Sequence, residues 1–140
     1  DVAPLPTLQR LVPLADYAVF SDAGLLVYAQ CDDVERALLA VGPRHAGHVG
    51  ASCGPDGYRW YENGRVRHVS APKVEAIDTL GAGDVFHGGF ALALLEGRSI
   101  EEAARFACAA ASLKCTRFGG RLGCPTRAET EALVAKTYGS

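Results

Sequence analysis

A short glycine-rich segment, Asp78–Asp84 with the sequence Asp-Thr-Leu-Gly-Ala-Gly-Asp, has the residue types and spacing best suited to chemistry. Gly81 and Gly83 allow backbone N–H groups to turn inward and approach an anion closely. The apolar run that follows predicts a long helix. Its first N–H groups would have no partner within the helix, and its dipole is positive at that end. The segment therefore predicts a pocket for a phosphate or a developing oxyanion.

Asp84 falls in the first turn of this predicted helix, beside the anion pocket. A carboxylate there could take the proton of a substrate hydroxyl while the pocket holds a phosphoryl group. The alternative is structural, because an Asp after Gly-x-Gly often caps a helix and stabilises it by about 1 kcal/mol. His87, one turn later, could face the same cleft or be an ordinary hydrogen-bonded helix histidine. The segment is neither a Walker A loop nor a dinucleotide-binding loop.

Short apolar runs in the first half of the chain predict the strands of a sheet. Ser21–Gly24 reads as a turn between two of the elements. Asn63-Gly64 lies between two alternating runs, which is the strongest short-range pattern for a β-hairpin. The predicted strands are Tyr17–Phe20, His48–Ser52, Tyr58–Glu62 and Arg65–Val69.

Helical periodicity dominates the second half of the chain. Ser99 with Glu102, and Thr126 with Glu129, have the spacing of capping boxes at the start of two helices. Strands that alternate with helices in the first half predict an α/β fold with a mostly parallel sheet plus a hairpin. No linker stands out, so we expect one domain. The predicted helices are Leu8–Leu11, Asp33–Val41, Asp84–Glu96, Ile100–Thr116 and Thr126–Lys136.

Composition narrows the class of protein. The 140 residues are 49% hydrophobic, and 14 basic and 16 acidic residues are well mixed. This fits a globular domain and gives no basic stripe for nucleic acid. No apolar run is long enough to predict a membrane span. The cysteines form no Cys-x-x-Cys pair, which favours free thiols in a reducing compartment, so we expect a cytoplasmic protein. They are Cys31, Cys53, Cys108, Cys115 and Cys124.

The segment Asp78–Phe90 closely resembles the C-terminal signature of the ribokinase-like (PfkB) carbohydrate kinases, D-T-x-G-A-G-D-x-F-x-[GA]. Upstream, Ser52–Gly57 resembles the T-x-G-x-x-G nucleotide loop of that family. Downstream, Arg105–Lys114, Thr116–Gly120 and Pro125–Glu129 resemble the segments that follow the signature. The resemblance implies a ribokinase-like three-layer α/β/α fold with a mostly parallel sheet and a β-hairpin, of which this chain would be the C-terminal portion.

The start of the chain agrees with that expectation. The first residue is Asp1 and there is no methionine. We therefore expect residues 1–140 to be the C-terminal nucleotide-binding and catalytic part of a kinase domain, without its N-terminal half and lid. The resemblance also implies a homodimer formed through that lid.

The resemblance implies a role for each matching residue. Asp84 would be the catalytic base that activates a sugar hydroxyl. The backbone amides of Gly81, Ala82 and Gly83 would form the anion hole for the transferred phosphate. Cys108 matches a position that lines the adenine pocket. The other residues implied to contact ATP are Ser52, Cys53, Gly54, Pro55, Asp56 and Gly57, with Gly83 and Asp84 at the phosphates.

Two metal sites follow from the same resemblance. Asp78 would help to bind an activating monovalent cation such as K⁺, together with the backbone carbonyls of Leu80, Lys114, Arg117 and Gly119. Gly123 stands where ribokinase has a serine ligand. Where the family usually shows N-x-x-E, linked to magnesium, this chain has Ser21-Asp-Ala-Gly24. Either Asp22 substitutes for the glutamate, or Mg²⁺ is held through water and the ATP phosphates.

The expected activity is ATP-dependent transfer of the γ-phosphoryl group to a hydroxyl of a small sugar or sugar acid. Two alternatives stay open. A non-catalytic module could use the same loops to bind a nucleotide, and a member of the same family could phosphorylate a nucleoside. The acceptor is not predicted, because the resemblance assigns most sugar contacts to the N-terminal half.

Overall fold

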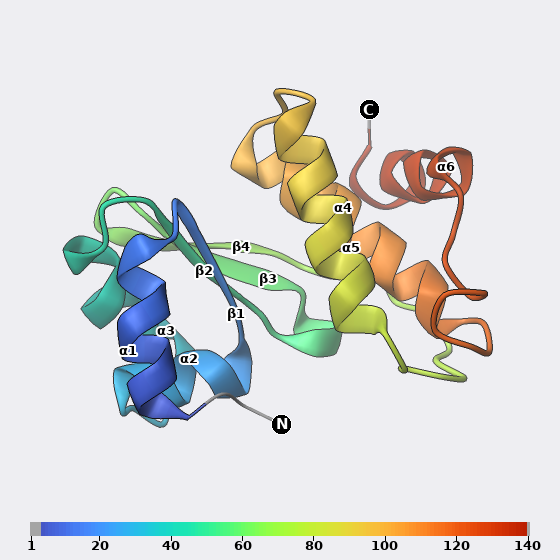
Figure 1. The fold of residues 1–140 in the computed structure, drawn as a ribbon. Coiled ribbons are helices and arrows are strands. Elements are labelled where there is room, and N and C mark those ends of the chain that lie inside the picture. The colour runs from blue at the N-terminus through green and yellow to red at the C-terminus, as the bar shows by residue number, and fades with distance from the viewer. Residues whose placement is uncertain (1–3, 140) are drawn as a thin grey trace. The chain divides into compact units, whose positions relative to one another are not determined.

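The computed structural model describes residues 4–139, which form two compact units (Figure 1). The first unit comprises the residues up to Cys53 together with Tyr58–His68. The second comprises Gly54–Gly57 together with the residues from Val69 onward.

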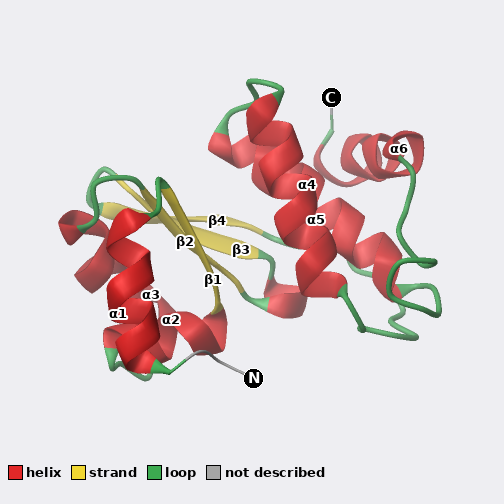
Figure 2. Ribbon diagram, viewed as in Figure 1, coloured by secondary structure: helices red, strands yellow, loops and turns green. Residues whose placement is uncertain are grey.

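The first unit contains a four-stranded sheet in the order β1-β2-β3-β4, shown in yellow in Figure 2. Strands β1 and β2 pair in parallel, with Tyr17 opposite His48 and Ser21 opposite Ser52. Strands β2 and β3 pair antiparallel, with Gly50 opposite Trp60. The strands are β1 (Tyr17–Ser21), β2 (His48–Ser52), β3 (Tyr58–Glu62) and β4 (Arg65–Val69), and the helices are α1 (Leu5–Leu11), α2 (Asp22–Ala29) and α3 (Val34–Val41), with 3₁₀ turns at Val12–Leu14 and Gly42–Arg44.

All four strands and the hairpin at Asn63-Gly64 are confirmed. The sheet is mixed, and among the described residues parallel pairing is limited to β1 and β2. The connection lengths explain this arrangement. Between β1 and β2 the chain passes through α2 and α3, which gives the long crossover that parallel strands need. Only a short turn follows β2 before β3 begins, so these two strands run in opposite directions.

Alternating side chains of the parallel pair form the core of the first unit. Ala18 and Phe20 on β1 are buried, as are Val49 and Ala51 on β2. Leu25 of α2 and Ala37 and Leu38 of α3 complete the cluster with no exposed surface. The two helices therefore cover one face of β1 and β2.

The predicted turn at Ser21–Gly24 is wrong, because Ser21 instead caps a helix. Its side chain accepts a hydrogen bond from the N–H of Gly24 at 3.1 Å, and α2 continues to Ala29. Asp22 occupies the first helical position, where a carboxylate interacts favourably with the helix dipole. Small and polar residues mark turns and helix starts alike, which is why the two were confused.

The second unit consists of a 3₁₀ turn at Gly54–Asp56 and three long helices, α4 (Ala82–Leu95), α5 (Ile100–Cys115) and α6 (Arg127–Tyr138). Both predicted capping boxes are present. Ser99 and Glu102 start α5, and Thr126 and Glu129 start α6. The helix α4 begins two residues before its predicted start, because Gly81 rather than Asp84 is its cap.

Small residues let α4 and α5 approach closely. A Cβ added at Gly89 would lie 3.4 Å from the Cα of Ala107. On the neighbouring turns of α4, Phe86 and Phe90 are buried, with ring centroids 6.0 Å apart. The alanine-rich sequence of α5 is therefore a packing surface for α4.

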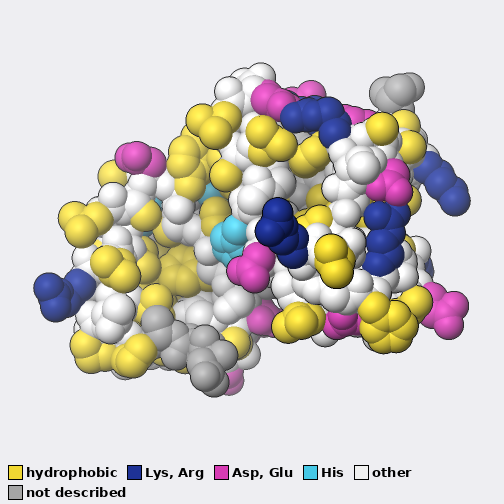
Figure 3. Space-filling view, turned by 45° about the vertical axis from the view of Figure 1, so that its right-hand side comes forward, with side chains coloured by type: hydrophobic (Ala, Val, Ile, Leu, Met, Phe, Trp, Pro, Cys, Tyr) yellow, Lys and Arg dark blue, Asp and Glu magenta, His cyan; other side chains and the backbone are white. Residues whose placement is uncertain are grey.

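Apart from the buried Lys114, the charged side chains of the described residues are at least partly exposed. On the face drawn in Figure 3, basic and acidic side chains are interspersed. In the second unit, Arg98 pairs with Glu131 of α6, and Arg127 pairs with Glu96 at the end of α4. All five cysteines are free, as predicted. Among residues 4–139, no helix combines the length and apolar character that a membrane span requires.

Candidate active site

Gly81 sets the geometry of the predicted anion pocket. Its φ of 76° lies in the left-handed region that favours glycine. This backbone conformation turns the chain from the loop into α4, with Gly81 at the N-cap and no side-chain cap. Asp84 is exposed at the third helical position. The interpretation of Asp84 as a simple N-cap is therefore wrong, and its carboxylate is left available for other chemistry.

The amides at this helix start are not equivalent. The N–H of Ala82 donates to the carbonyl oxygen of Thr79 at 3.1 Å, so an anion would compete with this bond. The first hydrogen bond of the helix runs from Val85 to the carbonyl of Gly81 at 3.0 Å. Gly83 and Asp84 precede Val85 and belong to the helix start, where N–H groups lack acceptors within the helix. A Cβ at Gly83 would meet nothing within 4 Å, so the backbone there is accessible.

His87 interacts with the same turn. Its Nδ1 lies 2.8 Å from the carbonyl oxygen of Gly83, one helical turn earlier. This contact supports the interpretation of His87 as a hydrogen-bonded helix histidine.

Asp78 joins the loop before α4 to the loop after α5. Its Oδ1 accepts the N–H of Leu80 at 2.9 Å, and its Oδ2 accepts the N–H of Gly119 at 2.8 Å. These two backbone donors, followed by the nearby ammonium of Lys114, hold the pKa of Asp78 below its usual value despite partial desolvation. The N–H of Asp78 also donates to the carbonyl of Cys115 at 3.1 Å. Asp78 therefore fixes the loop that leads into the anion pocket.

The side chain of Lys114 reaches the predicted cation ligands. It is fully buried. Its Nζ donates to the carbonyl oxygen of Asp78 at 2.7 Å and to that of Arg117 at 3.4 Å. The same ammonium lies 3.5 Å from Oδ2 of Asp78. The resemblance implied a role only for the backbone carbonyl of Lys114, so these contacts of its side chain were not predicted.

Two other predicted cation ligands already accept hydrogen bonds from backbone N–H groups. The carbonyl of Lys114 accepts the N–H of Arg117 at 3.1 Å, and the carbonyl of Gly119 accepts the N–H of Gly123 at 3.1 Å. A monovalent cation placed among these oxygens would lie beside a buried ammonium, and like charges repel strongly where water is excluded. The arrangement therefore does not fit a separate monovalent cation.

The predicted nucleotide loop spans both units. Ser52 and Cys53 end the first unit, and the Oγ of Ser52 donates to the carbonyl of Phe20 at 3.4 Å. The loop residues Gly54 and Gly57 lie in the second unit, and Pro55 and Asp56 lie between them in the 3₁₀ turn.

The two glycines of this loop serve different purposes. Gly54 has a φ of 53°, and a Cβ there would meet nothing within 4 Å. Gly57 has a φ of 96°, and a Cβ there would lie 2.0 Å from the carbonyl oxygen of Val69. Gly57 is therefore required for packing of the backbone, whereas Gly54 leaves its side open to a ligand.

Cys108, predicted to line the adenine pocket, is only 3% exposed. It lies near Tyr138, whose hydroxyl donates to the carbonyl of Ser70 at 2.6 Å. Burial, followed by the nearby Cys108, raises the pKa of Tyr138. Cys108 is thus packed within the second unit.

The described residues form no carboxylate cage for magnesium. Among the described residues, no group of three or more His, Cys, Asp or Glu side chains converges on a metal position. Asp22, one of the two alternatives for the missing glutamate, is exposed and accepts the N–H of Ala23 at 2.7 Å.

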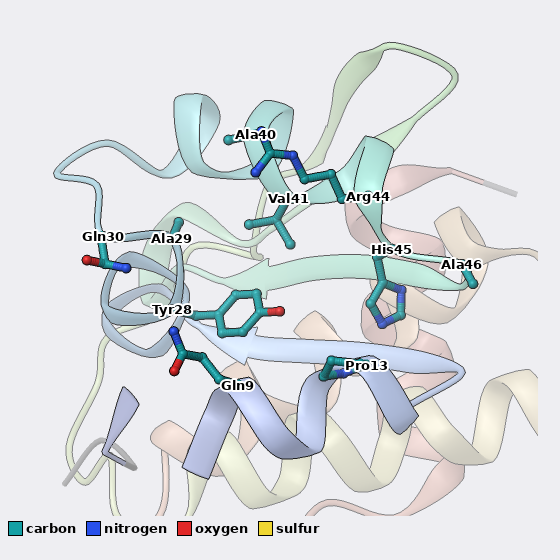
Figure 4. Close-up of a pocket in the computed structure, with 10 residues that line it drawn as sticks. All are labelled: Gln9, Pro13, Tyr28, Ala29, Gln30, Ala40, Val41, Arg44, His45 and Ala46. Carbon is teal, nitrogen blue, oxygen red and sulfur yellow. The ribbon is translucent and has the colours of Figure 1, made fainter. Parts of the chain in front are cut away.

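A separate pocket of about 410 Å³ lies in the first unit (Figure 4). The described residues that line this pocket include none of those predicted for the active site. His45 faces this pocket, and both of its ring nitrogens have partners. The Nε2 of His45 lies 3.0 Å from the carbonyl oxygen of Val12, and the Nδ1 of His45 accepts the N–H of Gly47 at 3.0 Å. The lining residues are Gln9, Pro13, Tyr28, Ala29, Gln30, Ala40, Val41, Arg44, His45 and Ala46.

Comparison with known proteins identifies the family of this chain. The family model described as pfkB family carbohydrate kinase matches residues 1–127. Ribokinase from Bacillus subtilis (strain 168) is 45% identical over 82 residues, which cover 59% of this chain and 28% of the relative. Ribokinase from Haemophilus influenzae is 36% identical over 113 residues, which cover 79% of this chain and 37% of the relative.

The crystal structure of a proposed ribokinase from Agrobacterium tumefaciens is also similar. It superposes with a TM-score of 0.95 at 40% identity and covers 100% of this chain and 47% of that protein. The chain thus spans less than half the length of these relatives. The similarity confirms the ribokinase-like fold and the expected resemblance. The chain belongs to the pfkB family of carbohydrate kinases.

Proposed function

We propose that this chain supplies the nucleotide-binding and catalytic part of an ATP-dependent kinase for a small sugar or sugar acid. The observation that carries the proposal is the turn at Gly81, which places an exposed Asp84 in the same helical turn as the uncapped amides of α4. A base and an anion site beside each other are what transfer of a phosphoryl group to a hydroxyl requires.

Each group has a defined task in this proposal. The amides of Gly83 and Asp84, with the positive end of the α4 dipole, hold the transferred phosphoryl group and its developing charge. The Asp84 carboxylate takes the proton from the acceptor hydroxyl as the oxygen attacks phosphorus. General-base assistance of this kind is worth about 10²–10⁴-fold in rate.

ATP and Mg²⁺ are supported by structural neighbours. A proposed ribokinase II from Escherichia coli was solved in complex with ATP and Mg²⁺, and it matches this chain with a TM-score of 0.84 at 26% identity. In this chain, the open side of Gly54 fits close approach of a nucleotide. Because no carboxylate cage is formed by the described residues, Mg²⁺ would be held chiefly by the ATP phosphates and water.

A sugar acceptor is supported in the same way. Arabidopsis thaliana ribokinase was solved with ribose and ATP, and it matches this chain with a TM-score of 0.81 at 31% identity. A fructokinase from Vibrio cholerae was solved with fructose and ADP, and it matches with a TM-score of 0.84 at 28% identity.

The test measures ADP release by the full-length protein with ATP, Mg²⁺ and a panel of pentoses, hexoses, sugar acids and nucleosides. Asp84→Asn should lower turnover with the best acceptor by about 10²-fold or more and leave ATP affinity within about threefold. The matched control is Asp32→Asn, which changes an exposed carboxylate just before α3 that forms an ion pair with Arg36. Full activity in the Asp84→Asn protein would refute the role of the base.

The panel also separates the alternatives. ATP binding by calorimetry without ADP release for any acceptor would indicate a nucleotide-binding module. A preference for nucleosides would indicate a nucleoside kinase of the same family.

A further inference from the structure

Two of the oxygens expected to bind a monovalent cation, the Oδ2 of Asp78 and the carbonyl oxygen of Arg117, already lie beside a positive charge of this chain. The Nζ of Lys114 lies 2.7 Å from the carbonyl oxygen of Asp78, 3.4 Å from that of Arg117 and 3.5 Å from Oδ2 of Asp78. An ammonium group has three donors and no acceptor. The two carbonyl oxygens accept hydrogen bonds from it, and the carboxylate of Asp78 forms an ion pair with it. The charge is thus compensated although the side chain is fully buried.

The location of Lys114 in its helix explains how the side chain reaches this site. Ala103, Ala107 and Ala110 of α5 are buried at intervals that place them on the same helix face as Lys114. Lysine is rarely fully buried unless it is paired. Its burial at the end of an apolar stripe is therefore a strong indication of a dedicated role for the charge.

Neighbouring backbone closes the site around the lysine stem. A Cβ added at Gly123 would lie 3.3 Å from Cε of Lys114 and 2.5 Å from the carbonyl oxygen of Gly119. Gly123 is itself buried, and its N–H donates to the Gly119 carbonyl at 3.1 Å. The loop from Gly119 to Gly123 therefore fits over the lysine only without a side chain at position 123.

We propose that Lys114 is a built-in cation that replaces an exogenous monovalent cation and positions the loop before α4. It does so through Asp78, whose carbonyl and carboxylate both face the ammonium and whose carboxylate binds the amides of Leu80 and Gly119. Gly81 lies in the same loop, two residues after Thr79. A Cβ at Gly81 would lie 3.4 Å from the Cα of Gly120, so the loop before α4 and the loop after α5 approach closely there. The lysine therefore acts on the anion pocket as a positioning residue.

This proposal separates the chain from a structural neighbour. Phosphofructokinase-2 from Escherichia coli was solved in complex with potassium, and it matches with a TM-score of 0.79 at 25% identity. We expect stability and turnover of the present protein to be the same in potassium as in tetramethylammonium chloride of equal ionic strength.

The decisive experiment removes the lysine and offers a free cation in its place. Lys114→Ala opens the site, and Lys114→Met removes the charge but keeps most of the volume. For the full-length protein, thermal unfolding and ADP release are measured in K⁺, NH₄⁺ and tetramethylammonium. The expected result is a loss of about tenfold or more in turnover for both variants in tetramethylammonium. K⁺ or NH₄⁺ restores Lys114→Ala and does not restore Lys114→Met. The matched control, Lys136→Ala, changes an exposed lysine of α6 and should behave as wild type.

A direct measurement accompanies the rescue. Crystals of each protein are soaked in Tl⁺, which scatters anomalously. We expect a peak beside Asp78 and Arg117 in Lys114→Ala and none there in the wild type. Activation of the wild type by K⁺, a Tl⁺ peak at these oxygens in the wild type, or a Lys114→Ala protein as active in tetramethylammonium as the wild type would each overturn the proposal.

The outcomes stay distinct from those that test the kinase activity. If Lys114→Ala does not fold in any salt, the unfolding and Tl⁺ measurements on the wild type still decide the proposal. If no acceptor is phosphorylated, the proposed function fails, while thermal unfolding and Tl⁺ binding still report on Lys114.

Discussion

The carboxylate of Asp78 accepts the backbone N–H of Gly119, 41 residues later in the chain, at 2.8 Å. Its other oxygen accepts the N–H of Leu80 at 2.9 Å. One side chain therefore fixes two loops, and one of them leads directly into the turn at Gly81. The shape of the predicted anion pocket depends on this bridge.

Replacing Asp78 by Asn should lower both stability and turnover. An amide retains one acceptor oxygen, so one of the two N–H groups loses its partner and the buried Lys114 loses its carboxylate. We expect a melting temperature several degrees lower, because unpaired buried polar groups are costly.

The pH dependence of this contact has a defined sign. The pKa of Asp78 is held below 3.8, chiefly by the N–H groups of Leu80 and Gly119. The stabilisation is therefore complete above that value and is lost as the pH falls below it. Thermal melts of both proteins between pH 2.5 and 7 measure the difference. An Asp78→Asn protein with wild-type stability at pH 7 would contradict the bridge.

Replacing Gly83 by Ala should separate stability from activity. A Cβ at Gly83 meets nothing within 4 Å, and alanine is favoured over glycine in a helix by up to about 1 kcal/mol. In the proposed mechanism, the methyl group would nevertheless lie where the transferred phosphoryl group approaches. We expect slightly raised stability in urea and a fall in turnover of about tenfold or more.

Gly88→Ala provides the matched control for this variant. Gly88 is on the same helix, and a Cβ there also meets nothing within 4 Å. It should raise stability by a similar amount and leave turnover within about twofold. Equal turnover in the two variants would argue against a phosphate at Gly83.

Gly57→Ala should unfold or severely destabilise the protein. The residue has a φ of 96°, and the new Cβ would lie 2.0 Å from the carbonyl oxygen of Val69. Because the obstacle is backbone, we expect a loss of about 3 kcal/mol or more. Gly54→Ala should cost only the strain of a left-handed backbone conformation, a loss of about 1–2 kcal/mol in the free energy of unfolding. The free energies of unfolding of the two variants are measured in urea. Similar losses in both would refute the close approach of Gly57 to the carbonyl oxygen of Val69.

His48 should make the first unit less stable in mild acid. Burial lowers its pKa from 6.5 to about 4, although Glu62 opposes the shift. The Nε2 lies 2.7 Å from the hydroxyl of the buried Tyr58. The folded state thus favours the neutral ring, so stability is complete above pH 6.5 and declines as the pH falls toward 4.

The expected loss is about 1–2 kcal/mol, allowing for partial exposure of the ring. His48→Gln should flatten the pH dependence of the free energy of unfolding over that interval. His68→Gln, which changes an exposed histidine of β4, should leave it unchanged. A wild-type free energy that is constant between pH 6.5 and 4.5 would show that His48 is not buried as described.

Much of the fold could be predicted because local signals agreed with the tertiary structure. The Asn63-Gly64 turn and the capping boxes that begin at Ser99 and Thr126 are each determined by a few neighbouring residues. The start of α4 could not be placed correctly, because a left-handed glycine cap leaves no polar side chain as a signal. The helix α2 was missed because Ser21 and Asp22 are as common in turns as at helix starts.

In the candidate site, too, the parts made of contiguous residues could be predicted and the parts made of distant segments could not. The motif at Asp78–Asp84 placed the loop and the carboxylate correctly at the helix start, since these residues are contiguous. The role of the Lys114 side chain depends on oxygens from two distant segments, which no local pattern reveals. A signal was nevertheless present, because Lys114 continues the buried face of Ala103, Ala107 and Ala110. The roles in nucleotide binding and phosphoryl transfer stay predictions.

The closeness of Gly123 to the Lys114 stem also constrains how this site could change over time. A side chain gained at position 123 would meet both Cε of Lys114 and the carbonyl of Gly119. A lineage that kept the lysine could therefore not acquire a side-chain ligand at 123 without rebuilding the loop. Loss of the lysine alone would not make room either, because the carbonyl oxygen of Gly119 would still lie 2.5 Å from the new Cβ.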